Sequence, residues 1–283
     1  MRFVFVALCA LTLGGASSAS IPPPPPLGGP VVPGELRVLA VGDFGIGLPA
    51  ERTTGEALSR FERRNPASLL LALGDNDYTA GASFSESWNE SFGWLRRAGV
   101  GVAGVLGNHD VMFEGGSYEL AALNMPRRYY TRRFGDVQLF ALDSNETGDA
   151  QTRWLRRALA SSRASWKIAA FHHPAYTCGG YTGRKDIVRR WTPLFARYHV
   201  QLVLSGHDHN YQRFLPRRRV TYVVDGGGGA HLYAIVACPY PYPRRLRAIS
   251  AHGFLYLIVG SERLDGYAIS MGGRVIDHFI VGP

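Results

Sequence analysis

The sequence predicts an α/β fold in which a parallel sheet packs against a second, antiparallel sheet. Apolar segments with buried-strand character alternate with amphipathic helical segments as far as residue 205, a pattern typical of βαβ units. Beyond residue 214, segments of alternating polarity are separated by Gly-rich turns, as in antiparallel strands. With 283 residues and 46% hydrophobic side chains, the chain can bury a substantial core.

Strands and helices alternate in the first part of this domain. Strands are expected at residues 36–41, 68–73 and 100–106, and amphipathic helices at 50–64 and 84–97 between them. Each strand runs into a glycine that is followed by polar side chains. Because the strands are apolar throughout, they are predicted to lie in a sheet that is covered on both faces.

The rest of the chain begins with a hairpin and then returns to the same alternation. A hairpin is expected at 129–144, helices at 151–162 and 185–198, and strands at 166–171 and 200–205. The antiparallel part comprises the segments 219–229, 254–261, 264–273 and 274–281. No boundary is visible after residue 34, so residues 35–283 are predicted to form one domain.

The first 34 residues are predicted to lie outside the domain. Residues 1–20 have the charged start, apolar run and small-residue end of a signal peptide, and the run is shorter than the ~20 residues of a membrane span. Residues 21–34 contain a polyproline tract, which favours an extended spacer, with a ligand for a recognition domain as the alternative. The mature protein is therefore expected to be secreted, or periplasmic in the cell envelope, without a membrane span.

Cysteine usage agrees with export. Cys9 falls within the signal peptide, which leaves Cys178 and Cys238 in the mature chain. Two cysteines in an oxidising compartment suggest one disulfide, although the sequence alone leaves the pairing open.

The formal net charge is +9, and nearly all of the positive charge comes from arginine. The arginine pairs are spread along the chain, whereas a nucleic-acid binder typically clusters them on one helix or arm between aromatic residues. They therefore indicate solvated surfaces or a field that attracts anionic substrates. We expect a monomer that acts on small molecules and binds no specific nucleic acid.

Five strand-to-loop junctions carry residue types that bind metal ions. Ligands bind beyond the carboxyl ends of parallel strands, so these side chains are expected to converge. They are Asp43; Asp75 and Tyr78; Asn108 and His109; His172 and His173; and His207 and His209. Hard oxygen donors mixed with imidazoles, without a thiolate, suit Fe, Mn or Zn better than a structural zinc or copper(I) site.

Parts of this set have simpler interpretations. Asp43 alone could be a turn or cap residue. Asp75, Asp77 and Glu86 have the spacing of calcium-loop ligands, but Ala80 stands where that loop needs glycine and a buried strand precedes it. The calcium interpretation therefore fails.

The ordered motifs GDFG, GDNDY, GNHD, FHHP and GHDH resemble the five motif blocks of the calcineurin-like metallophosphoesterases. The GDxxY block and the short chain make the sequence most similar to the small, tartrate-resistant type of purple acid phosphatase. The resemblance spans residues 36–214 and implies a four-layer α/β/β/α sandwich. Two positions depart from the family pattern: Ala169 replaces a valine, and Asp77 stands where the small enzymes often have an aromatic residue.

Carried over to this sequence, the resemblance implies two metal ions. Fe(III) would be held by Asp43, Asp75, Tyr78 and His209, and a divalent ion (Fe, Zn or Mn) by Asp75, Asn108, His172 and His207. A phenol of pKa ~10 gives up its proton only to a hard, highly charged ion, so Tyr78 favours Fe(III). Such a pair of ions clamps phosphate oxygens and acidifies a water that attacks phosphorus.

The resemblance also gives roles toward the substrate. His109 would hydrogen-bond the phosphoryl group or protonate the leaving alkoxide. Asn108, besides holding the divalent ion, is a candidate substrate-binding residue. His173, His231 and His252 are candidate substrate-contacting residues, and ordinary surface or loop histidines are the alternative interpretation for each.

The expected function is hydrolysis of phosphate monoesters by an exported acid phosphatase. The nearest alternative is a phosphodiesterase or nuclease on the same scaffold, although relatives of that kind usually have a histidine where this chain has Gly45, and no ligating tyrosine. A more distant alternative is a non-enzymatic envelope protein that binds polyanions through its arginines.

Overall fold

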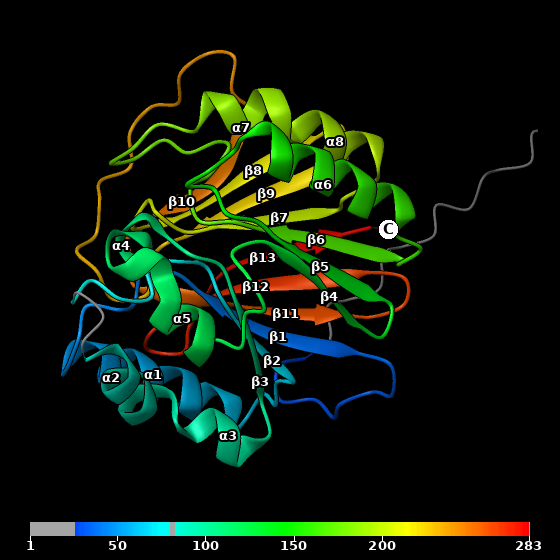
Figure 1. Ribbon diagram of the computed structural model, residues 1–283. Coiled ribbons are helices and arrows are strands. Elements are labelled where there is room, and N and C mark those ends of the chain that lie inside the picture. The colour runs from blue at the N-terminus through cyan, green and yellow to red at the C-terminus, as the bar shows by residue number, and fades with distance from the viewer. Residues whose placement is uncertain (1–25, 80–82, 283) are drawn as a thin grey trace, which may run out of the picture.

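The computed structural model describes residues 26–79 and 83–282. Within these ranges two sheets pack face to face, and helices cover the outer face of each sheet (Figure 1). This arrangement confirms the four-layer α/β/β/α fold class. The signal peptide predicted at residues 1–20 lies outside the described residues, and none of the described helices is long and apolar enough to cross a membrane.

The first sheet has six strands in the order β13-β12-β11-β1-β2-β3. Parallel pairing joins β1 (Leu36–Val41), β2 (Leu69–Ala72) and β3 (Gly101–Gly104), and antiparallel pairing adds β11 (Gly253–Val259), β12 (Leu264–Ser270) and β13 (Val275–Val281). The outer face is covered by α1 (Ala50–Glu62), α2 (Phe84–Phe92) and α3 (Trp94–Ala98) (Figure 1). Because both faces are covered, every residue of β2 and β11 is buried.

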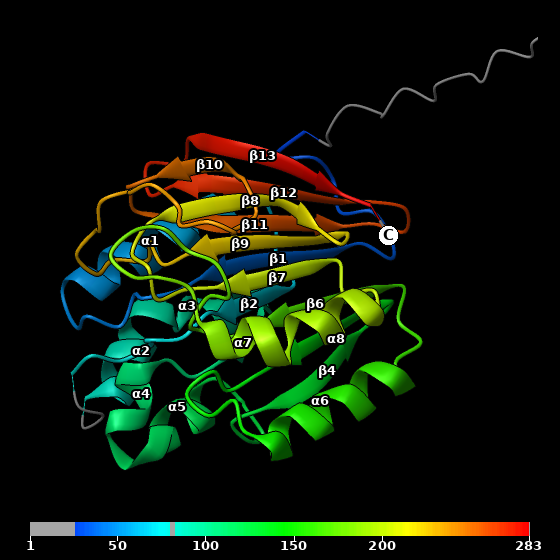
Figure 2. The ribbon, with the colours of Figure 1, turned by 90° about the horizontal axis from the view of Figure 1, so that it is seen from above.

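The second sheet has seven strands in the order β10-β8-β9-β7-β6-β5-β4. The parallel strands are β5 (Val137–Ala141), β6 (Trp166–Ala170), β7 (Leu202–Ser205) and β9 (Val220–Asp225), and the antiparallel ones are β4 (Tyr130–Phe134), β8 (Tyr211–Arg217) and β10 (Arg245–Ile249). Helices α6 (Asp149–Ser161), α7 (Lys185–Arg190) and α8 (Thr192–Arg197) cover its outer face. Figure 2 shows edge strands β10 and β13 on the same side, where Arg247 donates a hydrogen bond to the Ile276 carbonyl.

The strands that carry the motifs are divided between the two sheets. The sequence pattern predicts one parallel sheet that contains all of them and a second sheet formed by the C-terminal strands alone. This part of the prediction is wrong. β1, β2 and β3 lie in the first sheet, whereas β6 and β7 lie in the second. The C-terminal strands extend both sheets. Hydrophobic periodicity identifies a buried strand but not its neighbour, so it could not reveal this division.

Two expected helices are each interrupted. The helix expected at 84–97 divides at Gly93, and the one at 185–198 divides at Trp191, after which Pro193 occupies the first turn of α8. Residues 108–122, for which the sequence predicts no helix, form α4 (Asn108–Met112), a short 3-10 turn and α5 (Ser117–Ala122).

The described part of the Pro-rich segment lies against the domain. Leu27 packs against the buried hydrophobic core, and the Gly28 N–H donates to Asn65 Oδ1 at 2.7 Å. The guanidinium of Arg37, which is only 4% exposed, donates to the carbonyls of Gly29 and Pro30. The spacer expected at 21–34 therefore contacts the domain from residue 27 onward.

Candidate metal centre

The junctions singled out in the sequence meet where the parallel strands of both sheets end. Asp43 follows β1, Asp75 and Tyr78 follow β2, Asn108 and His109 begin α4, His172 follows β6, and His207 and His209 follow β7. Their side-chain donor atoms form two neighbouring groups.

The first group consists of Asp43, Tyr78 and His209. The phenol oxygen of Tyr78 lies 3.3 Å from Asp43 Oδ1 and 3.2 Å from His209 Nε2, and the last two atoms are 3.3 Å apart. Asp43 is fully buried and His209 is 6% exposed. Three potential ligand atoms therefore surround one point.

The second group consists of Asp75, His172 and His207. His172 Nε2 lies 3.3 Å from Asp75 Oδ2 and 3.2 Å from His207 Nδ1, and one ligand atom from each residue falls within 4.8 Å of the others. The Asn108 amide oxygen is buried and has no hydrogen-bond partner within the described ranges. A buried acceptor without a donor is costly, so this oxygen is available for a cation.

Hydrogen bonds fix the orientation of two imidazoles. His172 Nδ1 bonds the Leu73 carbonyl at 3.0 Å, and His209 Nδ1 bonds the His231 carbonyl at 2.7 Å. Because a carbonyl only accepts, Nδ1 carries the proton in each ring and Nε2 is left with a lone pair in the neutral form. Each Nε2 atom faces a carboxylate oxygen, an arrangement that a proton or a metal ion between the two atoms satisfies and that is typical of metal-binding histidines.

The electrostatics of the cluster also favour positive charge. Burial opposes the ionisation of Asp75, but His172 and the His109 backbone N–H outweigh it and hold the pKa of Asp75 below its usual value. Burial likewise disfavours a charged His172, yet Asp75 and Asp43 raise its pKa to about 9. By contrast, burial and the neighbouring His172 lower the pKa of His207, which is neutral and able to donate a lone pair.

Three of the candidate ligands have left-handed backbone conformations. The φ angles are 61° at Asp43, 50° at Asp75 and 69° at His207. Residues other than glycine adopt this region rarely and at a cost, which a surrounding structure must offset. Here Asp43 Oδ2 accepts the His207 N–H at 2.8 Å, and Asp75 Oδ1 accepts the His109 N–H at 2.9 Å. The ligand loops are thus held in place by the carboxylates themselves.

Two glycines allow these loops to come together. Gly74 has φ of +91°, and a Cβ on it would lie 2.6 Å from His172 Nδ1. A Cβ on Gly107 would lie 2.0 Å from Asp75 Oδ1. Both positions require the absence of a side chain.

Two buried aspartates that were not among the predicted site residues support the ligands. Asp110 accepts hydrogen bonds from the backbone N–H groups of Gly107, Asn76 and Asp77 and from the Asn76 amide, which joins the loops after β2 and β3. Asp208, between the two histidines of GHDH, accepts from Thr177, Gly180, Asn210 and Gln212. Their only sequence signal was a place within GNHD and GHDH.

The four other candidate histidines occupy different settings. His109 is half-buried with its ring 4.3 Å from that of Tyr78. His173 is 9% exposed, bonds Ser144 Oγ at 2.9 Å, and has a pKa lowered by burial and His172 to about 3. The His231 carbonyl accepts the hydrogen bond from His209, whereas the His231 side chain is exposed. The His252 ring hydrogen-bonds the Gly227 carbonyl.

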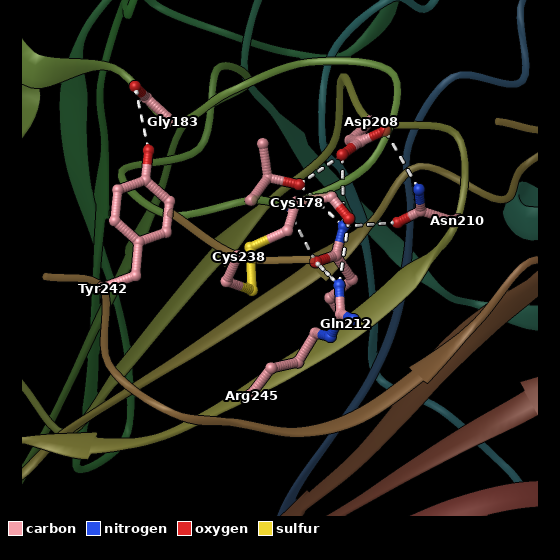
Figure 3. The surroundings of a disulfide bond; sticks show 9 residues. Cys178, Gly183, Asp208, Asn210, Gln212, Cys238, Tyr242 and Arg245 are labelled. Atoms are coloured by element: carbon pink, nitrogen blue, oxygen red, sulfur yellow. Dashed lines mark hydrogen bonds between the residues drawn. A yellow bond between two sulfur atoms is a disulfide. The ribbon is translucent and has the colours of Figure 1, made fainter. Parts of the chain in front are cut away.

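Cys178 and Cys238 form a disulfide beside this centre (Figure 3). The bridge joins the loop that follows β6 to the loop that follows β9. Figure 3 shows Asp208, Asn210 and Gln212 next to it, with the Gln212 side chain accepting the Cys178 N–H at 3.0 Å.

The sequence of the chain matches a known protein family. The family model described as calcineurin-like phosphoesterase matches residues 36–211. The chain is similar to the tartrate-resistant acid phosphatase type 5 of Rattus norvegicus, with 27% identity over 292 residues that cover 84% of this chain and 88% of the rat protein. The corresponding human protein is also 27% identical, over 68% of this chain and 73% of its own.

Solved structures show the same fold. A purple acid phosphatase, PPD1 from yellow lupin seeds, aligns with a TM-score of 0.72 and 20% identity, covering 91% of this chain and 55% of the lupin chain. This chain thus spans about half of the lupin protein. GAP50, described as the anchor in the inner membrane complex of Plasmodium, aligns with a TM-score of 0.74 and 16% identity over 88% of this chain and 89% of its own.

Proposed function

Because the chain belongs to the calcineurin-like phosphoesterase family, we propose that it is a phosphoric monoester hydrolase with a two-metal centre. The observation that carries the proposal is the pair of adjoining donor groups, Asp43–Tyr78–His209 and Asp75–His172–His207. Similarity to acid phosphatases supports hydrolysis of phosphate esters, and a bridged cysteine pair fits an exported protein.

Fe(III) is the ion proposed for the group that contains Tyr78, with Asp75 shared between the two ions. Burial and then the carboxylates of Asp43 and Asp75 raise the pKa of the Tyr78 phenol. Only a hard, strongly charged ion can hold such a phenol as its phenolate. The divalent ion (Fe, Zn or Mn) is assigned to Asp75, Asn108, His172 and His207, where the amide oxygen of Asn108 is neutral.

The metal pair, when bound, supplies Lewis acidity and an acidified water for in-line displacement at phosphorus. The residues of the chain position the substrate and supply the proton for the leaving group. The Asp75 carboxylate fixes the His109 backbone, and the ring of Tyr78 supports the His109 imidazole. From this position His109 would hydrogen-bond the phosphoryl group or give a proton to the leaving alkoxide. Buried His173 is held by Ser144 and packs against the rings of His172 and His207, which it helps to position.

A monoester is favoured over a diester by the geometry at Gly45. A Cβ on Gly45 would lie 1.9 Å from the Asn76 carbonyl oxygen, so the backbone excludes the histidine that diesterases of this family usually carry there. The phosphodiesterase therefore remains the second candidate, and the polyanion-binding protein the third.

Metal analysis with an absorption spectrum, followed by turnover of phenyl phosphate and bis(phenyl) phosphate, tests the proposal. We expect iron, a visible Tyr78-to-iron charge-transfer band that Tyr78→Phe removes, and faster monoester turnover at acidic pH. A colourless, fully active zinc or manganese enzyme would contradict the iron assignment. Faster diester turnover would support the phosphodiesterase, and metal-replete protein without hydrolysis would support the polyanion binder.

A further inference from the structure

Two tyrosines stack on two histidines of the candidate metal centre. The Tyr181 and His207 rings are 4.0 Å apart between centroids at an interplanar angle of 22°, and the Tyr233 and His209 rings are 4.3 Å apart at 10°. The two phenol rings meet edge to face at 5.5 Å and 81°. Tyr181 is 41% exposed, so the pair forms a border between the ligand imidazoles and solvent.

The Tyr181 loop is anchored to the GHDH motif. Asp208 accepts hydrogen bonds from the Thr177 hydroxyl and from the Gly180 N–H, and Cys178 pairs with Thr182 across the loop. These contacts fix the backbone on both sides of Tyr181. Asp208 lies between His207 and His209 in the sequence. Its hydrogen bonds therefore hold the Tyr181 loop next to the two histidines.

The Tyr233 loop is anchored in the same place. The Tyr233 N–H donates to the His209 carbonyl at 3.0 Å, and its carbonyl accepts from Ser250 Oγ at 2.9 Å. Gly180 of the other loop packs flush on the Tyr233 ring, because a Cβ on Gly180 would lie 2.5 Å from a ring atom. The ring therefore has a fixed position.

The disulfide joins the two loops covalently. Cys178 and Cys238 lie three and five residues from Tyr181 and Tyr233 in sequence, and the Val236 N–H donates to the Cys178 carbonyl at 3.2 Å beside the bridge. Arg245 also donates to the Cys178 carbonyl, as the surroundings in Figure 3 show. The disulfide and these hydrogen bonds thus tie the loops of the two tyrosines together.

We propose that Tyr181 and Tyr233 form an aromatic wall that selects phosphate monoesters with flat, aromatic leaving groups. The inference rests on the proposed function and adds the substrate class. An ester group on a phosphate held by the ligand cluster would lie beside this wall. An aromatic ring can stack on or meet the edge of an immobilised phenol, whereas a small alkyl group gains little from it.

Binding of two phosphonates, which are not hydrolysed, tests the wall in the metal-loaded protein. Isothermal titration calorimetry would compare phenylphosphonate with methylphosphonate for wild type, Tyr181→Leu, Tyr233→Leu and Tyr181→Phe. The expected result is a phenyl-to-methyl affinity ratio that falls about fivefold in each Leu variant and is kept in Tyr181→Phe, with little change for methylphosphonate. Tyr240→Ala, which removes a 98% exposed tyrosine of the same loop, is the matched control.

An unchanged ratio in both Leu variants, or an equal loss for the two phosphonates, would overturn the wall and leave the rings as supports for the imidazoles. Failure of the hydrolase is a separate outcome. If wild type does not hydrolyse phenyl phosphate but the affinity ratio falls in the Leu variants, the wall stands and the monoesterase does not. If phenyl and methyl phosphates are hydrolysed and the Leu variants slow both equally, the monoesterase stands and the wall does not.

Discussion

Gly107 illustrates how a single backbone position decides the metal site. A Cβ at this residue would lie 2.0 Å from Asp75 Oδ1 and 2.2 Å from the Asp75 nitrogen. The loops after β2 and β3 can approach each other only because this side chain is missing. Whether a residue can act as a metal ligand therefore depends on its neighbours as well as on its own donor atom.

Gly107→Ala should displace Asp75 and lower metal affinity about 10- to 100-fold, as loss of a ligand-orienting contact does. The measurement is metal per chain after dialysis at fixed free metal. Gly272→Ala is the matched control, because a Cβ there meets nothing closer than 3.9 Å. Full metal retention in Gly107→Ala would show that the loops can move apart freely.

Glu51 gives stability a pH dependence. It is 1% exposed, one of its carboxylate oxygens has no hydrogen-bond partner in the described part of the chain, and burial raises its pKa to about 7. An unfolded glutamate loses its proton near pH 4.3, so between that pH and about 7 the unfolded state ionises while the folded state stays protonated. The contribution of Glu51 to stability therefore falls over this window and stays low above it.

Glu51→Gln should raise the free energy of unfolding at pH 8 by about 1–3 kcal/mol and change it little at pH 4. Urea denaturation at the two pH values measures the difference. Glu56→Gln, at an exposed position of the same helix, should be neutral at both. An equal gain at pH 4 would mean that ionisation is not the cause.

At the scale of elements, close packing of α1 on α2 depends on Gly55. A Cβ there would lie 2.0 Å from the Ser91 carbonyl oxygen. Gly55→Ala would favour an isolated helix by about 1 kcal/mol, but the helices must separate, and overpacking costs about 1–3 kcal/mol. We expect a lower free energy of unfolding in denaturant titrations, with exposed Glu56→Ala as control. A more stable Gly55→Ala would show that α1 shifts without cost.

The elements also show what a sequence can reveal. Strands ending in Gly-Asp or Gly-His were predictable because an apolar run followed by a polar turn is a local pattern, and the donor set of the candidate site came from those turns. The division of β1–β3 from β6 and β7 was not predictable, since pairing is a long-range property. Tyr181 and Tyr233 were missed for the same reason: only folding and the disulfide bring their loops to the GHDH motif.

At the scale of the whole molecule, the candidate ligands link the two sheets. Asp43, Asp75, Tyr78 and Asn108 follow strands of the first sheet, and His172, His207 and His209 follow strands of the second. An ion held by both sets stabilises the folded state in proportion to its affinity, because the unfolded chain does not present the ligands together.

Removal of metal by a chelator should therefore lower the thermal midpoint. At a free metal concentration of about 100 times Kd the loss is about 2.7 kcal/mol, or roughly 5–10 °C for a chain of this size. Differential scanning calorimetry with and without added metal measures it. Asp75→Ala should abolish the response, whereas Asp136→Ala, on an exposed hairpin turn, should keep it. A response that survives Asp75→Ala would place the stabilising ion elsewhere.

The sulfur bridge closes a covalent ring of chain that contains the whole GHDH motif together with β7, β8 and β9. Much of the stretch from His231 to Ala237 inside that ring is open to solvent, where a protease can reach it. A cut there produces two fragments that cannot drift apart, so a clipped molecule would migrate as a single species until a thiol reagent releases its halves.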